Sequence, residues 1–133
     1  MDAKSLMIGD WVYSDVLKNP FQIGRPSDFR FMYEKKHEVF DDNGELRYIH
    51  PIPLTGEILK LNGFVSKRKY GLHFYLPHKG FEIFECFDGG GIDVVGYGLT
   101  INKKTVGIYY VHQLQHTLRL AGLNELADNL LIK

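Results

Sequence analysis

The chain has 133 residues, 44% hydrophobic and 14% aromatic, which suits a folded domain with its own core and excludes a disordered chain. Sixteen basic residues balance sixteen acidic ones, so the net charge gives no overall attraction to nucleic acid or to an anionic membrane. Cys86 is the only cysteine, which excludes an internal disulfide, and no run of about 18 apolar residues could span a bilayer. The N-terminal residues also lack the apolar stretch of a signal peptide. We therefore expect one domain over residues 1–133, in a soluble, cytoplasmic protein with no membrane partner.

The first half of the chain has the signals of strands joined by turns. Residues 7–13 predict a first strand, followed by a loop that contains Pro20, Gly24 and Pro26. Residues 29–40 alternate apolar and polar side chains in part, as a half-buried strand does. Asn43-Gly44 then favours a tight turn into a partner strand over residues 46–52, so we expect a hairpin there.

The middle of the chain predicts a short helix and further strands. Thr55 is suited to cap the N-terminus of a helix over residues 56–62, and Gly63 to end it. Residues 72–76 and 81–87 predict a second hairpin, and residues 93–101 another strand before a turn at 102–104. Gly96 and Gly98 match no phosphate-binding motif, and we interpret them as kinks in that strand.

The C-terminal segment predicts an amphipathic helix that ends near Gly122. Its apolar stripe consists of Val111, Leu114, Leu118 and Ala121. Asn124 is placed to cap a last short helix that contains Leu126, Ala127, Leu130 and Leu131. The order of elements predicts an α+β fold: a bent, mostly antiparallel sheet, a short central helix and a C-terminal helix packed on the sheet. A small SH3-like barrel is an option for the first half.

The polar flank of the final helix is the first candidate site. His112, His116 and Arg119 form this flank, and Gln115 lies between it and the apolar stripe. Tyr109, just before the helix, is a further candidate contact residue. Arginine offers a planar fork of donors and histidine gains charge as pH falls, so the flank could bind an anion or a partner's carboxylate. The alternative is structural: these side chains would hydrogen-bond to the backbone where the helix meets the sheet.

Histidines four residues apart on a helix, such as His112 and His116, can share a metal ion. This spacing raises the alternative of a small metal-dependent hydrolase. However, no glutamate follows His112 as a hydrolytic base, and Arg119 would place a positive charge beside the metal. We therefore predict no cofactor and no enzymatic activity.

A second candidate site combines basic and aromatic residues between positions 67 and 79. Basic side chains contact phosphates and aromatic rings stack on unpaired bases, so this segment could bind single-stranded nucleic acid. The residues concerned are Lys67, Arg68, Lys69 and Tyr70, followed by further basic and aromatic positions. The alternative is a solvated turn beside a strand with buried aromatic residues.

Three segments together resemble a family of uncharacterised small proteins encoded by gut anaerobes, their phages and their mobile elements. The segments are residues 8–13 (IGDWVY), residues 52–55 (IPLT) leading to 62–64 (NGF), and residues 110–115 (YVHQLQ). The resemblance implies an accessory protein of mobile DNA and supplies no activity. We therefore predict a non-enzymatic binding or interaction module whose partner is a protein, a nucleic acid or a small anionic ligand.

Overall fold

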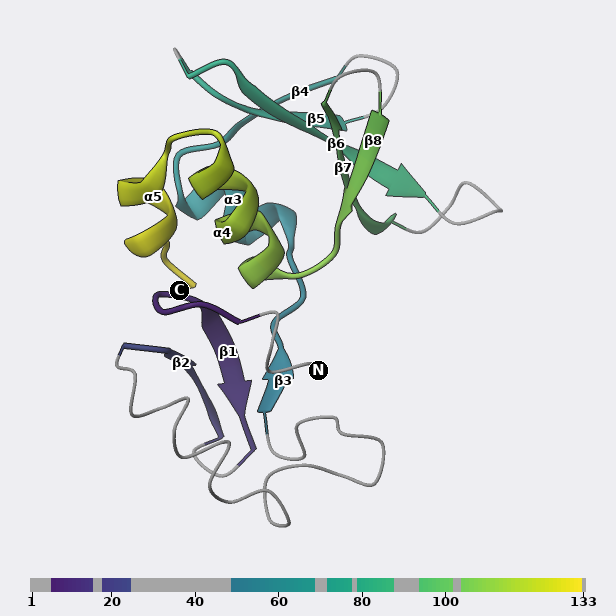
Figure 1. The fold of residues 1–133 in the computed structure, drawn as a ribbon. Coiled ribbons are helices and arrows are strands. Elements are labelled where there is room, and N and C mark those ends of the chain that lie inside the picture. The colour runs from purple at the N-terminus through teal and green to yellow at the C-terminus, as the bar shows by residue number, and fades with distance from the viewer. Residues whose placement is uncertain are drawn as a thin grey trace. The chain divides into compact units, whose positions relative to one another are not determined.

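The computed structural model describes residues 6–15, 18–24, 49–68, 72–77, 79–87, 94–101 and 104–132. The chain divides into two compact units, Met1–Ile52 and Pro53–Lys133. In the described residues the first unit contains a three-stranded sheet, and the second contains a five-stranded sheet with three helices (Figure 1). All strand pairs are antiparallel, so the predicted α+β fold is confirmed. That the whole chain is one domain stays a prediction.

The sheet of the first unit has the strand order β2-β1-β3. Its strands are β1 (Trp11–Ser14), β2 (Asn19–Gln22) and β3 (Ile49–Pro51). The predicted loop at Pro20 is wrong, because Pro20 lies in β2 opposite Tyr13. Proline lacks a backbone N–H and is tolerated in a strand at the edge of a sheet, which is where β2 lies. The described strands form an open sheet, so the barrel considered for this half is not seen in them.

A tight turn around Asp10 precedes β1. The buried Asp10 carboxylate accepts a hydrogen bond from the backbone N–H of Met7 (2.8 Å). Gly9 has a φ of 97°, which favours glycine, and its N–H donates to the carbonyl of Ile23 (2.6 Å). The first strand therefore begins at Trp11, later than predicted, because Asp10 and Gly9 belong to this turn.

The predicted hairpin of residues 29–52 falls mostly outside the described residues. The strand at 29–40 and the turn at 41–44 lie there. Of the predicted partner strand, Ile49–Pro51 form β3, which pairs with β1.

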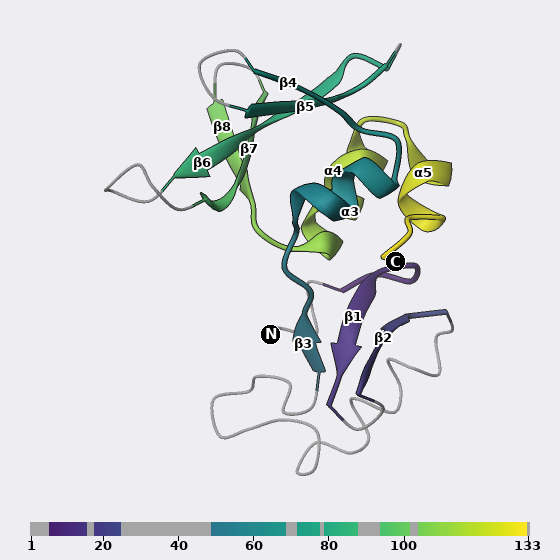
Figure 2. The same ribbon diagram turned by 180° about the vertical axis from the view of Figure 1, so that it is seen from behind.

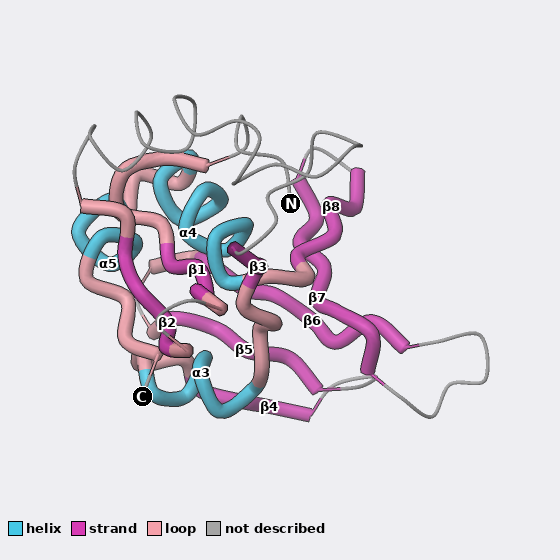
Figure 3. Tube along the Cα trace, turned by 90° about the horizontal axis from the view of Figure 1, so that it is seen from below, coloured by secondary structure: helices cyan, strands magenta, loops and turns pink. Residues whose placement is uncertain are grey.

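The sheet of the second unit is a meander in which neighbouring strands follow one another in the chain (Figure 3). Its strands are β4 (Val65–Arg68), β5 (Leu72–Leu76), β6 (Phe81–Phe87), β7 (Val94–Ile101) and β8 (Lys104–Ile108). The predicted hairpin of residues 72–87 is confirmed as β5 and β6. Side chains alternate between the two faces of a strand, so this sheet has an inner and an outer face.

The inner face of this sheet is apolar and carries the helices. Its buried side chains include Phe74, Ile83, Tyr97 and Ile108. A Cβ atom at Gly56, the first residue of helix α3, would lie 3.1 Å from the Phe74 ring, which shows how closely α3 approaches this face. Both side views place α3 and α4 on the same side of the sheet (Figures 1 and 2).

The first helix of this unit begins as predicted and ends one residue earlier than predicted, because Asn62 is its C-cap. Helix α3 spans Gly56–Leu61, and the Thr55 hydroxyl accepts the N–H of Ile58 (3.2 Å) as its N-cap. Gly63 follows with a φ of 89°, which suits the residue that ends a helix.

Helix α4 (Val111–Leu120) closes the core of this unit. Val111, Leu114 and Leu118 have no exposed surface, which confirms the apolar stripe. Ala121 is the exception, because it is the exposed C-cap residue. Gly122 follows with a φ of 80°, as predicted for the end of this helix.

Helix α5 (Asn124–Asp128) is shorter than predicted and is capped one residue earlier. Its N-cap is Leu123, because the carbonyl of Leu123 already accepts the N–H of Ala127 (3.1 Å). The N–H of Leu123 is itself bound to the carbonyl of Leu118 (2.8 Å), so the end of α4 leads directly into α5.

Candidate functional site

The junction between β8 and α4, which carries Tyr109, is fixed by hydrogen bonds from two directions. The side-chain oxygen of Gln113 accepts the N–H groups of Tyr109 (2.8 Å) and Tyr110 (3.1 Å). The carbonyl of Tyr109 accepts the N–H of Leu54 (3.0 Å), and Pro53 and Tyr110 form an isolated β-bridge. Tyr109 therefore stands on a rigid backbone although its side chain is 48% exposed.

The residues predicted to form one polar flank on α4 have different surroundings in the structure. His112 and Gln115 are buried, and the Gln115 amide donates to the carbonyl of Ala127 in α5 (2.9 Å). Arg119 of α4 forms an ion pair with Asp128, which is also in α5 (3.2 Å). Of the predicted contact residues, Gln115 and Arg119 thus join α4 to α5, while Tyr109 faces outward.

His112 and His116 are brought together by the helix, as their spacing predicted. Their ring centroids are 5.7 Å apart, and the His112 ring stacks on Tyr110 at 6.0 Å. Within the described residues, no group of three or more histidine, cysteine, aspartate or glutamate side chains is placed to hold a metal ion.

The residues of the predicted nucleic-acid site lie partly on the outer face of the five-stranded sheet. Lys67 pairs with His73 in the register of β4 and β5, so both belong to this face, and both side chains are partly exposed. Arg68 is exposed on the same strand but one position further along, on the opposite face. Lys69 and Tyr70 lie outside the described residues.

Four side chains of this face form a polar cluster. Glu82 lies 2.6 Å from His73 Nδ1 and 3.4 Å from Lys67 Nζ. The Lys67 ammonium also lies 4.9 Å from the centre of the Tyr75 ring, within the range of a cation–π contact. The hydrogen bond from His73 is the largest cause that lowers the pKa of Glu82; burial opposes it, and the charge and hydrogen bond of Lys67 together with the charge of His73 keep the pKa below its ordinary value. Glu82 therefore stays a carboxylate that fixes two basic side chains on the sheet.

Glycines occupy the next outward positions on β7 and β8, and aromatic rings fill the space above them. A Cβ atom at Gly96 would lie 2.6 Å from Cε1 of the Tyr109 ring, and one at Gly107 would lie 2.8 Å from the same ring. A Cβ atom at Gly98 would lie 2.7 Å from the ring of Phe84. The Tyr109 ring thus packs against the backbone of Gly96 and Gly107, and the Phe84 ring packs against the backbone of Gly98. We call the side chains of Tyr75, Phe84 and Tyr109, with these glycines, the ring face.

Sequence reasoning missed the ring face because it interpreted Gly96 and Gly98 as kinks. The pairing of β6 with β7 continues through both glycines, and its irregularity falls at Cys86 and Phe87. The signal was the spacing: Gly96 and Gly98 are two residues apart, as are Gly107 near the end of β8 and Tyr109 just after it, so the members of each pair point to the same side of the sheet.

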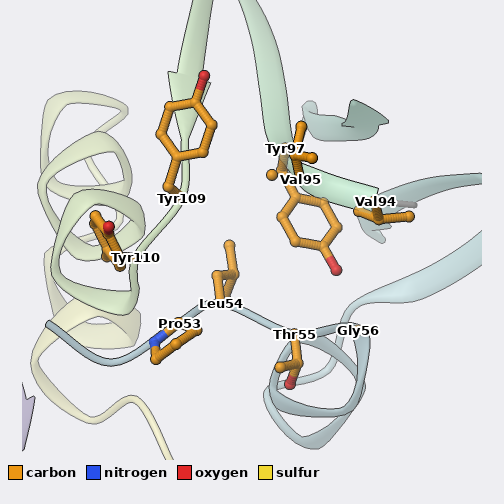
Figure 4. Close-up of a pocket in the computed structure, with 10 residues that line it drawn as sticks. Pro53, Leu54, Thr55, Gly56, Val94, Val95, Tyr97, Tyr109 and Tyr110 are labelled. Atoms are coloured by element: carbon orange, nitrogen blue, oxygen red, sulfur yellow. The ribbon is translucent and has the colours of Figure 1, made fainter. Parts of the chain in front are cut away.

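A pocket of about 400 Å³ borders the ring face at Tyr109 (Figure 4). Its lining includes Pro53, Thr55, Val95, Tyr97, Tyr109 and Tyr110. Burial raises the pKa of the Tyr97 phenol, and the nearby carboxylates of Glu85 and Glu57 raise it further, so this hydroxyl stays protonated. Tyr109 therefore takes part in two exposed features of the same unit.

The chain matches no protein-family model, no curated protein and no solved structure. In the described part of the chain, every helix is too short or too polar to cross a membrane.

Proposed function

We propose that the chain is a non-enzymatic binding module that contacts its partner through the ring face. The observation that carries this proposal is the Tyr109 ring, which is 48% exposed yet held against Gly96 and Gly107. A tyrosine offers a large contact area with few rotatable bonds, so a ring already fixed on the sheet loses little conformational entropy on binding. Exposed aromatic side chains on a rigid support are also typical of residues that contribute strongly to binding.

The place of this module in the cell is part of the same proposal. Its resemblance to proteins of phages and mobile elements supports an accessory role in mobile DNA. Two of the three segments behind that resemblance meet in the second unit, since Pro53 and Tyr110 form a β-bridge. A single cysteine, Cys86, suits a cytoplasmic location.

The proposal is tested by radical footprinting of the whole purified chain with and without cell-extract fractions. We expect at least one fraction from the source organism to slow the oxidation of Tyr109. Leu120, on α4, is 86% exposed and serves as the internal control whose oxidation rate should not change. Unchanged oxidation of Tyr109 in every fraction, or equal slowing at Leu120, would overturn the proposal.

The hydrolase alternative rests on the His112–His116 pair and has a separate test. Metal analysis of protein purified without an affinity tag measures whether a transition metal is bound. Stoichiometric zinc that disappears in His116→Ala would replace the binding proposal, because it would place a metal on these two rings. A metal content far below one ion per chain would favour the binding module.

A further inference from the structure

We infer that the partner of the ring face is single-stranded nucleic acid, whose bases stack on Tyr109 and Phe84 and whose phosphates approach Lys67. This inference rests on the proposed function, because it names the partner of the same surface.

The spacing of the two rings suits bases that are spread apart. Tyr109 and Phe84 fill the space above Gly96 and Gly98, which lie two residues apart on β7. Two strand residues span about 7 Å, so the rings lie side by side on one sheet and not on top of each other. Each ring can then hold a separate base, which is how sheet surfaces bind single strands whose bases are splayed out. In a duplex the bases already stack on one another, so the rings would find no free base face.

The charge of the face suits a weakly held phosphate backbone. Among the described residues whose register places them on this face, Lys67 and His73 are the basic ones and Glu82 the acidic one. Glu82 contacts both basic groups. It holds Lys67 over the Tyr75 ring, and the His73 ring lies 6.1 Å from the Phe84 ring, so both groups border the path of a strand that crosses the rings. Arg68, the next residue on the edge strand β4, lies on the opposite face of the sheet and does not add to the charge of the ring face. With one or two phosphates neutralised, the logarithm of affinity should fall with the logarithm of salt concentration with a slope of roughly −0.7 to −1.4.

The experiment is fluorescence anisotropy of the whole chain with labelled single-stranded DNA and RNA oligonucleotides, and with duplexes of equal length. We expect the single strands to bind, and the duplexes to bind at least about 10-fold more weakly since their bases are not free to stack. Tyr109→Ala and Phe84→Ala should each weaken binding by roughly 5- to 150-fold, the range for the loss of one stacked base. Tyr109→Phe, which keeps the ring, should restore the affinity that Tyr109→Ala loses, so the ring and not the hydroxyl makes the contact. Unfolding of Tyr109→Ala by denaturant, measured alongside, shows whether that variant is folded under the binding conditions.

The contribution of charge is tested with a pair of lysine variants. Lys67→Ala should make the salt slope shallower by about 0.7, the value for each single-strand phosphate that a basic side chain neutralises. Lys60→Ala removes an exposed lysine from α3 and should leave both affinity and slope unchanged.

The outcomes separate this inference from the proposed function. Oligonucleotides that fail to bind, while a cell-extract fraction still protects Tyr109, would overturn the nucleic-acid partner and leave the binding module in place. Protection that protease removes and nuclease does not would do the same, because it identifies a protein partner. If Tyr109→Ala and Phe84→Ala both bind as tightly as the unchanged chain, the contact lies elsewhere and the inference is overturned. Absence of both oligonucleotide binding and protection would overturn both proposals.

Discussion

The ring of Tyr109 fills the space above Gly96 that any other residue's side chain would need. A Cβ atom at Gly96 would lie 2.6 Å from Cε1 of this ring, closer than real Cβ contacts come. Glycine is unfavourable inside a strand because it has no side chain to pack, and a ring laid across it supplies the missing packing. The two residues therefore depend on each other, although 13 positions separate them in the chain.

This dependence predicts that Gly96→Ala destabilises the protein by about 1–3 kcal/mol, because the Tyr109 ring must move away. In a Tyr109→Ala background the same substitution should cost nothing, since the clash is gone and alanine suits a strand better than glycine. Chemical denaturation of the four proteins in this double-mutant cycle measures the coupling. Gly24→Ala is the control, because its Cβ would meet its nearest atom at 3.9 Å. An equal effect of Gly96→Ala with and without the Tyr109 ring would contradict the packing described here.

A second prediction concerns the buried amide that joins α4 to α5. Gln115→Leu keeps most of the side-chain volume but removes the donor to the carbonyl of Ala127. Ala127 has no exposed surface, so its carbonyl loses a bonded partner in a buried position. We expect a loss of about 1–3 kcal/mol in the free energy of unfolding, measured by denaturant titration. Gln113→Leu, in the first turn of the same helix, is the control that shows whether the loss is specific to the α4–α5 contact. The hydrogen-exchange rate of the Ala127–Asn129 amides should rise in Gln115→Leu and stay unchanged in Gln113→Leu.

Local sequence signals predicted the helices and the hairpin of β5 and β6 because the causes of these elements are local. Thr55, Gly63 and Gly122 act within one turn of the chain, so the residue types alone indicate where α3 begins and where α3 and α4 end. The strand at Pro20 was missed because proline is tolerated only at a sheet edge, and edge position depends on which strands pair.

The candidate site was predicted only in part, because its features depend on contacts between distant segments. A helical wheel places Gln115 at the margin of the apolar stripe, but only the contact with α5 explains its complete burial. Similarly, glycines become a ring face only when the register of β6, β7 and β8 brings Phe84 and Tyr109 over them. Tyr109 was selected from the sequence as a contact residue, whereas Phe84 was not.

The third prediction tests the core beneath α4. Leu114→Ala should cost about 2–5 kcal/mol, because Leu114 has no exposed surface and its removal leaves a cavity. Leu120→Ala makes the same chemical change on the same helix at a side chain that is 86% exposed, and should stay within about 0.5 kcal/mol. Thermal or denaturant unfolding of both variants gives the comparison. A similar midpoint for both would show that Leu114 does not close the core.

The fourth prediction is a pH dependence that originates at Glu82. Its pKa is lowered in the folded protein by His73 and Lys67, so the folded state binds the Glu82 proton less readily than the unfolded chain does. The resulting stabilisation is fully present above the unfolded pKa, roughly pH 4–5, and is lost as the pH falls through the lower folded pKa.

Unfolding free energies of the unchanged chain and of Glu82→Gln, measured across this range, should therefore differ by a constant amount at neutral pH and converge in acid. Glu125→Gln removes an exposed carboxylate from α5 and controls for the change in net charge. When Lys67→Ala and His73→Ala are present in both proteins, the difference in unfolding free energy should depend less on pH, since these two side chains lower the pKa of Glu82. High salt should reduce it as well, because Glu82 and Lys67 are both more than two-fifths exposed and their attraction is screened. A difference between the unchanged chain and Glu82→Gln that persists unaltered in acid would mean that Glu82 stabilises the outer face by packing and not by charge.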